Sequence, residues 1–332
     1  MIKYIIKRLL LAVFILLGVS IILYFLVRMM PLNAIESKYY ETHGGHSETN
    51  EAELQAILAR YNLADKSFGG IVKGWWLWLV KFFSGDMGTS FIKNRPVGDI
   101  IKENMGISFS ISLISLILEI MIAIPLGIKC ACNQYGKLDY TATVFTMIGI
   151  SFPTFFFGNL MIKFFAVDLG WFPANGINGN LLVTASGWER FVDMLWHMVL
   201  PLFVLTVLSI GSLMRYTRTN TLEVLNADYI RTARAKGLSE GKVVYKHVFR
   251  NTMIPLVTVL ASTLPGLFGG AMITETIFGI PGIGSTAYDL MRRGDVPFIM
   301  AYNMFIAVLT VIGILFADVM YAVVDPRVKL GK

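Results

Sequence analysis

Side chains that could bind a metal or form a disulfide are few in this sequence. Cys130 and Cys132 lie too close along the chain for an easy disulfide. His43 and His46 frame two glycines but have no carboxylate or thiol at ligand spacing. We therefore expect reduced, structurally quiet cysteines and no metal or other cofactor bound by this chain.

The common motifs of nucleotide-binding and hydrolytic enzymes are also missing. The chain contains no G-x-x-x-x-G-K-[ST] phosphate loop, because its Gly-Lys pairs at 136–137, 241–242 and 331–332 lack the rest of that motif. Neither H-E-x-x-H nor G-x-S-x-G occurs, so a membrane protease or lipase would lack its metal ligands or nucleophile. The sequence thus predicts no enzyme, and any ATP used in its work would be hydrolysed by partner subunits.

Two carboxylates fall inside strongly apolar stretches. Glu119 and Asp318 are expensive in hydrocarbon, where acidic side chains normally face the bundle interior or a water-filled path. We interpret both as candidates for a translocation path. The alternative for Glu119 is a protonated or hydrogen-bonded packing residue, and the sequence does not decide between the two.

The composition is that of an integral membrane protein. Of 332 residues, 55% are hydrophobic and only 15% charged, whereas soluble domains carry about a quarter charged residues. The net charge of +7 does not indicate nucleic acid, because the cations sit beside apolar spans rather than among exposed aromatics.

Apolar runs predict an all-α protein with six transmembrane helices. Each run exceeds the roughly 20 residues that a bilayer requires. The first is too long for the hydrophobic region of a cleaved signal peptide, so we expect a retained anchor. The predicted spans are 9–30, 105–128, 140–165, 193–214, 253–274 and 297–324. The predicted domains are an N-terminal transmembrane helix at 1–30, an extracytoplasmic loop at 31–104, a five-helix core at 105–324 that includes a cytoplasmic loop at 215–252, and a cytoplasmic tail at 325–332.

The long loop after the first span carries two helical patterns. A helix beginning near Thr49 or Asn50 would place Leu54, Ile57, Leu58 and Tyr61 on one face. The segment 71–83 is too short to span and holds Trp75, Trp76 and Trp78, so we place it flat on the outer surface. A peptide-binding aromatic patch is the alternative interpretation of these tryptophans.

The distribution of cations predicts the orientation. Lysines and arginines gather before the first span, at Lys129 and Lys137, in the 215–250 loop and in the tail, whereas the short loops on the other side carry few or balanced charges. Positive charge marks the cytoplasmic side. The prediction is N-in and C-in, with the 215–252 loop in the cytoplasm.

That loop contains a polar, basic stretch with the signals of a short helix. Asn226 can cap a helix start and Asp228 suits its first turn, while Arg231, Arg234 and Lys236 suit the last turn. Gly237 then stands where a left-handed residue ends a helix, and Ser239 can cap a second helix. A short helix with small residues and a charged rim is suited to docking in a partner's groove.

This stretch, D228-Y-I-R-T-A-R-A-K-G237-L-S, resembles the coupling loop of ABC-importer permeases of the oligopeptide and dipeptide family. The general form of that motif has Glu-Ala-Ala before three residues and Gly; here those positions are Arg231, Thr232 and Ala233, a departure shared by the peptide permeases. Further similarity to this family lies in G85-D-M-G-T-S90, L169-G-W-F-P-A-N-G176, E275-T-I-F-G-I-P-G-I-G284 and D325-P-R-V-K329.

The resemblance implies a type I ABC-importer-like permease in the inner membrane of a bacterium or archaeon. It implies four kinds of partner: a second homologous permease subunit, two ABC ATPase subunits, an extracytoplasmic peptide-binding protein and membrane lipid. It also implies that the residues coupling to the ATPase are Asp228, Tyr229, Arg231, Ala233, Arg234, Lys236 and Gly237. Dipeptides, nickel or glycan fragments are alternative cargoes, and a stand-alone channel or proton-coupled carrier is the alternative class.

Overall fold

The structure is a computed structural model, and it describes residues 2–29, 36, 39–41, 45–60, 65, 67–179 and 186–324. Within these ranges it is built from helices, and the only β-type pairing is an isolated bridge between Thr89 and Pro96. The predictions that concern His43, Tyr61 and the tail at 325–332 fall outside the described residues.

Five helices are long and apolar enough to cross a membrane, and a bent pair would make a sixth span. The long helices are α1 (Ile2–Met29), α5 (Val97–Cys132), α8 (Gly187–Leu225), α11 (Phe249–Gly269) and α14 (Val296–Val324). The bent pair joins α6 (Lys137–Ser151) to α7 (Thr154–Met161) and its π-helical continuation η1 (Ile162–Asp168). The shorter elements are α3 (Glu48–Arg60), α4 (Phe68–Phe83), α9 (Asp228–Ala235), α10 (Glu240–Lys242), η2 (Val243–Val248), α12 (Met272–Ile277) and α13 (Ile283–Arg292).

The third predicted span is broken rather than continuous. The chain turns by 104° between α6 and α7, so the apolar run predicted over 140–165 forms two helical segments. Pro153 lacks an N–H and disfavours helical geometry in the residue before it, and Phe152 is extended at φ −80° and ψ 130°.

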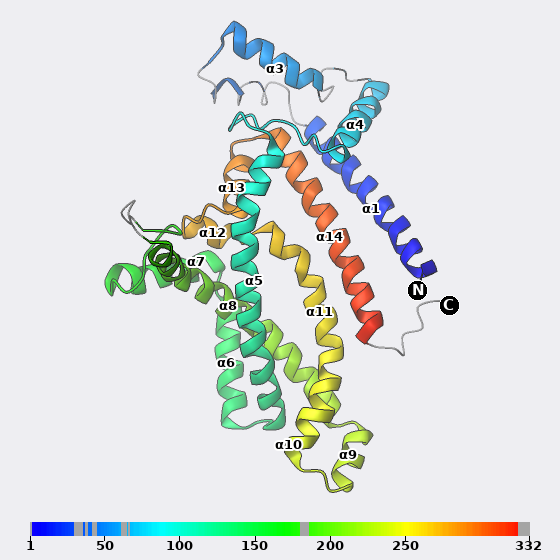
Figure 1. Cartoon of the computed structure of the whole chain (residues 1–332), viewed down its shortest axis with the longest axis vertical. Helices are drawn as coiled ribbons and strands as arrows, with labels where there is room; N and C mark the ends of the chain where they lie inside the picture. Colours follow the sequence, from blue (N-terminus) through cyan, green and yellow to red (C-terminus); the bar gives the residue numbers. More distant parts are fainter. Residues whose placement is uncertain are drawn as a thin grey trace.

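The predicted outer helices and the short basic helix lie at opposite ends of the molecule (Figure 1). α3 and α4 sit at the top of the view and α9 at the bottom, with α5, α11 and α14 running between them. α1 begins near mid-height, at the right of the view, and rises to α4.

The two helices of the long loop form as the patterns predict, and α4 packs along α1. Leu54 and Leu58 of α3 are buried. Trp78 is buried with its ring centroid 6.3 Å from that of Tyr24, and the Trp75 indole N–H donates to Ser20 Oγ at 3.0 Å. Trp75 and Trp78 both contact α1, so Trp76 is the most exposed of the three tryptophans.

A buried carboxylate fastens the loop before α5 to the start of α14. Asp295 accepts hydrogen bonds from the Ser90 hydroxyl, from Ile92 N at 3.2 Å and from Phe298 N at 3.1 Å. Its side chain is fully buried, and this burial raises the pKa of the Asp295 carboxyl, although the hydrogen bonds oppose the shift. The hydrogen bonds of Asp295 to Ser90 and Ile92 therefore join two segments that lie about 200 positions apart in the sequence, at separations of 205 and 203 residues.

Candidate functional site

The short helix α9 follows α8 with almost no linker. Asn226 does not begin it, contrary to the prediction: its backbone N–H bonds back to Leu222 O, and it ends α8. Ala227 occupies the cap position of α9 but makes no side-chain cap, because its methyl group has no oxygen to accept a backbone N–H. α9 is thus joined directly to a helix of 39 residues.

One face of α9 is buried against its own chain. Ile230 is fully buried and Ala233 nearly so, and they pack on Val243 and Val248 of η2, with Val224 and Leu225 at the edge. Apolar residues three apart lie on one helix face, so the buried stripe fixes which way α9 points. Ala233 belongs to this inner face, where a small side chain allows close packing.

The opposite face is charged and open to solvent. The side chains of Asp228 and Arg231 are 97% and 73% exposed and form an ion pair at 3.6 Å, which at this exposure contributes little stability. Tyr229 is about half exposed. α9 therefore offers two charges of opposite sign and an aromatic ring for contact with another molecule.

The turn after α9 is closed by a forked ion pair. Arg234 Nε lies 2.8 Å from Glu240 Oε1 and its Nη2 3.3 Å from Oε2, across Lys236 and Gly237. Gly237 has a φ of +76° and donates its N–H to Arg234 O, which is the left-handed turn predicted at this position. Glu240 was not predicted as the partner of Arg234; an acid six residues after a base, across a terminating glycine, is the only local signal for this pair.

The two acids predicted for a translocation path are not brought together. Glu119 is half-buried on α5 and faces Ser209 of α8, one turn from a contact of 3.4 Å between the hydroxyls of Ser115 and Thr206. Asp318, on α14, instead forms an ion pair at 3.1 Å with Arg8 of α1. Each acid is thus tied to a different neighbouring helix.

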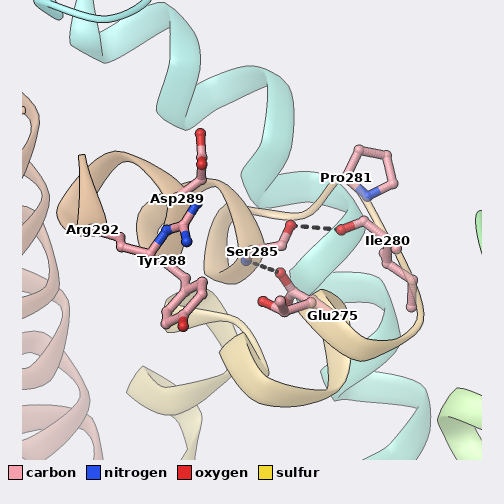
Figure 2. Close-up of a pocket in the computed structure, with 9 residues that line it drawn as sticks. Glu275, Ile280, Pro281, Ser285, Tyr288, Asp289 and Arg292 are labelled. Atoms are coloured by element: carbon pink, nitrogen blue, oxygen red, sulfur yellow. Dashed lines mark hydrogen bonds between the residues drawn. The ribbon is translucent and has the colours of Figure 1, made fainter. Parts of the chain in front are cut away.

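A second buried carboxylate, which the sequence analysis did not single out, organises the glycine-rich segment between α12 and α13. Glu275 accepts the backbone N–H groups of Ala271 and Ser285, each at 2.9 Å, and Figure 2 shows the bond from Ser285. It is almost fully buried, and its carboxylate lies at the N-terminal turn of α13, where the helix dipole favours negative charge.

The glycines of this segment make room for that carboxylate. A Cβ on Gly282 would lie 2.4 Å from Glu275 Oε2 and 2.4 Å from Ser108 Oγ, and one on Gly284 would lie 2.8 Å from Oε2. Ser108 of α5 accepts the N–H of Ile283 at 2.8 Å. The motif at 275–284 is therefore a capping arrangement that joins α5, α12 and α13.

A hollow of about 480 Å³ opens beside this arrangement. Tyr288, Asp289 and Arg292 of α13 line one side of it, and Ile280 and Pro281 the other (Figure 2). It is shallow and solvent-facing.

The described residues contain no cluster of three or more His, Cys, Asp or Glu side chains that could hold a metal ion. Cys130 is buried and Cys132 exposed, and both are free thiols.

Comparisons with known proteins agree with these features. Residues 123–330 match the family described as binding-protein-dependent transport system inner membrane component. The chain is 37% identical over 330 residues to the oligopeptide transport system permease protein AppB of Bacillus subtilis, covering 99% of this chain and 100% of that protein. It is 30% identical over 334 residues to the oligopeptide transport system permease protein OppB of Haemophilus influenzae, at 99% and 100% coverage.

Two further proteins are similar to this chain, one in sequence and the other in fold. The dipeptide transport system permease protein DppB of Bacillus subtilis is 32% identical over 333 residues, which cover 100% of this chain and 99% of that protein. A solved structure described as inward facing conformations of the MetNI methionine ABC transporter aligns with a TM-score of 0.53 at 18% identity, over 68% of this chain and 96% of that chain. This last likeness concerns the fold alone.

The match over residues 123–330 and the identity along nearly the whole length agree with the helical bundle and its short basic helix. The predicted resemblance is therefore confirmed, and ATP hydrolysis belongs to separate ATPase subunits rather than to this chain. The chain belongs to the family of binding-protein-dependent transport system inner membrane components, and is a permease subunit of an ABC importer in the inner membrane.

Proposed function

We propose that this permease subunit imports oligopeptides, forming half of a translocation pathway with a second homologous permease. Two ABC ATPase subunits drive the pathway and an extracytoplasmic peptide-binding protein delivers the cargo. The names of the relatives support the peptide class, because oligopeptide permeases of Bacillus subtilis and Haemophilus influenzae are 37% and 30% identical to this chain. Dipeptides are the second candidate, since a dipeptide permease is 32% identical over 333 residues.

The proposed topology has six spans, with both termini in the cytoplasm. α6 with α7 and η1 forms the third span, bent at Pro153, and residues 31–104 form the extracytoplasmic loop. The separation of α3 and α4 from α9 along the long axis supports this assignment (Figure 1). Glu119 lines the pathway in this proposal, whereas the ion pair of Asp318 with Arg8 favours a role in holding α1 against α14.

The proposed coupling element is α9, and its two-sided structure is the observation that carries the proposal. Its inner face is held by Ile230 and Ala233, while Asp228, Tyr229 and Arg231 project outward. A rigidly held helix with an open charged face can receive a push from a partner and pass it to the attached span. ATP binding would close the ATPase dimer, and the closure would move α9 and rock the spans between two states.

Gly237 tests this proposal because its substitution strains the turn without filling occupied space. A Cβ there meets nothing within 4 Å, so Gly237→Val acts through the φ of +76° alone, at a cost of about 1–3 kcal/mol. Gly241→Val is the matched control, because Gly241 is also open but lies in helical backbone without a positive φ.

The assay is ATP-dependent peptide uptake by the complete complex in proteoliposomes. We expect Gly237→Val to lower uptake while the ATPase subunits still hydrolyse ATP, and Gly241→Val to leave uptake near the wild-type level. Full uptake by an assembled Gly237→Val complex would refute the coupling role. Uptake without ATP by this chain alone would instead indicate a channel or carrier.

A further inference from the structure

α8 is packed between α5 and α6 with almost no space. A Cβ on Gly127 of α5 would lie 2.7 Å from Met214 O and 2.8 Å from Thr217 Cβ of α8. A Cβ on Gly211 of α8 would lie 2.9 Å from Thr146 O of α6. Glycine at both positions lets the three helices approach backbone to backbone, and such contacts resist sliding.

An ion pair locks the same three elements near the α9 end. Arg218 of α8 donates from Nε to Asp139 Oδ1 at 2.6 Å and from Nη2 to Oδ2 at 2.7 Å, and Asp139 lies in the first turn of α6. Asp139 also accepts the N–H of Tyr135, in the turn from α5 to α6, at 2.9 Å. The Asp139 side chain is only 5% exposed, so the fork is shielded from solvent and fixed in geometry.

The position of this pair matters for how α9 is supported. Arg218 lies two turns before Leu225, the last residue of α8, and α9 begins at Asp228. The pair holds α8 at the point where those two turns begin, and beyond it Val224 and Leu225 pack against α9 and η2. The end of α5 is close by, since Cys132 is within electrostatic reach of Arg234 and Glu240.

We propose that Asp139 and Arg218 are positioning residues for transport. By joining the α5–α6 turn to α8 two turns before its end, they make α5, α6 and α8 a single lever, so that a displacement of α9 moves the three spans together instead of bending α8 away from α5 and α6. This inference rests on the proposed coupling role of α9 and adds that the rigidity of its support determines how efficiently ATP hydrolysis is converted to transport.

The test measures peptide transported per ATP hydrolysed in the assembled complex. Arg218→Gln removes the charge and the fork, and Arg218→Lys keeps the charge but provides a single contact point. Arg95→Gln is the control: Arg95, in the loop before α5, makes a fork of similar geometry with Glu103 of α5, but this pair is exposed and lies far from α9. We expect the ratio to fall about fivefold or more in Arg218→Gln, to fall less in Arg218→Lys, and to stay at the wild-type value in Arg95→Gln.

A purely structural role would reduce assembly, and with it transport and ATPase activity together, leaving the ratio per assembled complex unchanged. That result, or a wild-type ratio in a fully assembled Arg218→Gln complex, would overturn the proposal. The proposed function is checked separately by cross-linking an ATPase subunit to a cysteine placed at exposed Tyr229. Failure of that cross-link would count against α9 as the coupling helix, whereas a normal cross-link with an unchanged ratio would count against the lever alone.

Discussion

The capping of α13 by Glu275 makes a quantitative prediction about stability. Glu275→Ala removes the acceptor of two N–H groups, those of Ala271 and Ser285, in a site that is almost fully buried. A buried donor left without a partner costs about 1–3 kcal/mol, so the expected loss is about 2–6 kcal/mol. Glu275→Gln keeps one carbonyl oxygen but turns its NH₂ toward the second N–H, so we expect about half of that loss.

The measurement is thermal unfolding of the purified permease complex in detergent. In large domains, 1 kcal/mol of stability corresponds to a few degrees in Tm, so the stability lost in Glu275→Ala corresponds to a fall in Tm on the order of 5–15 °C. Thr276→Ala is the matched control, because Thr276 is the exposed next residue and its hydroxyl bonds only Met272 O of its own helix. If Glu275→Ala unfolded within about a degree of the wild type, the capping argument would be refuted.

Two further substitutions test contacts at the outer helices and at the start of α14. Asp295→Asn should weaken the contact between the loop before α5 and α14 by about 1–3 kcal/mol, because the amide has one acceptor oxygen instead of two and its NH₂ must face the N–H of Ile92 or of Phe298. Limited proteolysis of that loop checks this, and an unchanged cleavage rate would contradict it. Trp75→Phe should lower the free energy of unfolding by about 0.5–1.5 kcal/mol, because it removes the hydrogen bond to Ser20. Adding Ser20→Ala to this variant should then cost little more. If the fall in Tm of the double variant equalled the sum of the two single falls, the hydrogen bond would contribute nothing.

The long helices could be predicted because a span is specified by composition over many residues. Five of the predicted apolar runs coincide with α1, α5, α8, α11 and α14, although α5 and α8 extend well beyond the apolar part into polar sequence. Gly237 could be predicted for a different reason. A terminating glycine after a basic last turn is a local signal, and the left-handed φ of +76° depends on that residue alone.

The bend at Pro153 shows where the sequence is insufficient. Pro125 lies inside α5 and Pro201 inside α8, and both helices continue through them, whereas Pro153 coincides with a turn of 104°. The same residue type has both outcomes because neighbouring helices decide whether the freed backbone groups are accommodated. The prediction that Asn226 begins a helix fails for a similar reason. Asparagine is also favourable at the end of a helix, which is where Asn226 lies in α8.

The parts of the candidate site that escaped prediction are contacts between distant residues. Asp139 and Arg218 are 79 residues apart, and Ser108 and Ile283 are 175 apart. Neither periodicity nor local motif signals such a pairing, whereas the exposed face of α9 follows from the spacing of Ile230 and Ala233.

These distant contacts give α5 a particular mechanical position. Near its end, Gly127 is pressed against α8 and Cys132 lies near the turn after α9. Towards its start, Ser108 bonds the first turn of α13 beside the buried Glu275. At 1.5 Å per residue, Ser108 and Cys132 are about 36 Å apart on one helix, which is more than the thickness of a bilayer's hydrocarbon core. A packed helix transmits displacement along its length, so a movement entering at α9 would reach α12 and α13 without passing through a flexible segment. The buried carboxylate of Glu275 and the ion pair of Asp139 with Arg218 lie near opposite ends of α5, and each would keep the neighbouring helices attached to it as it moves.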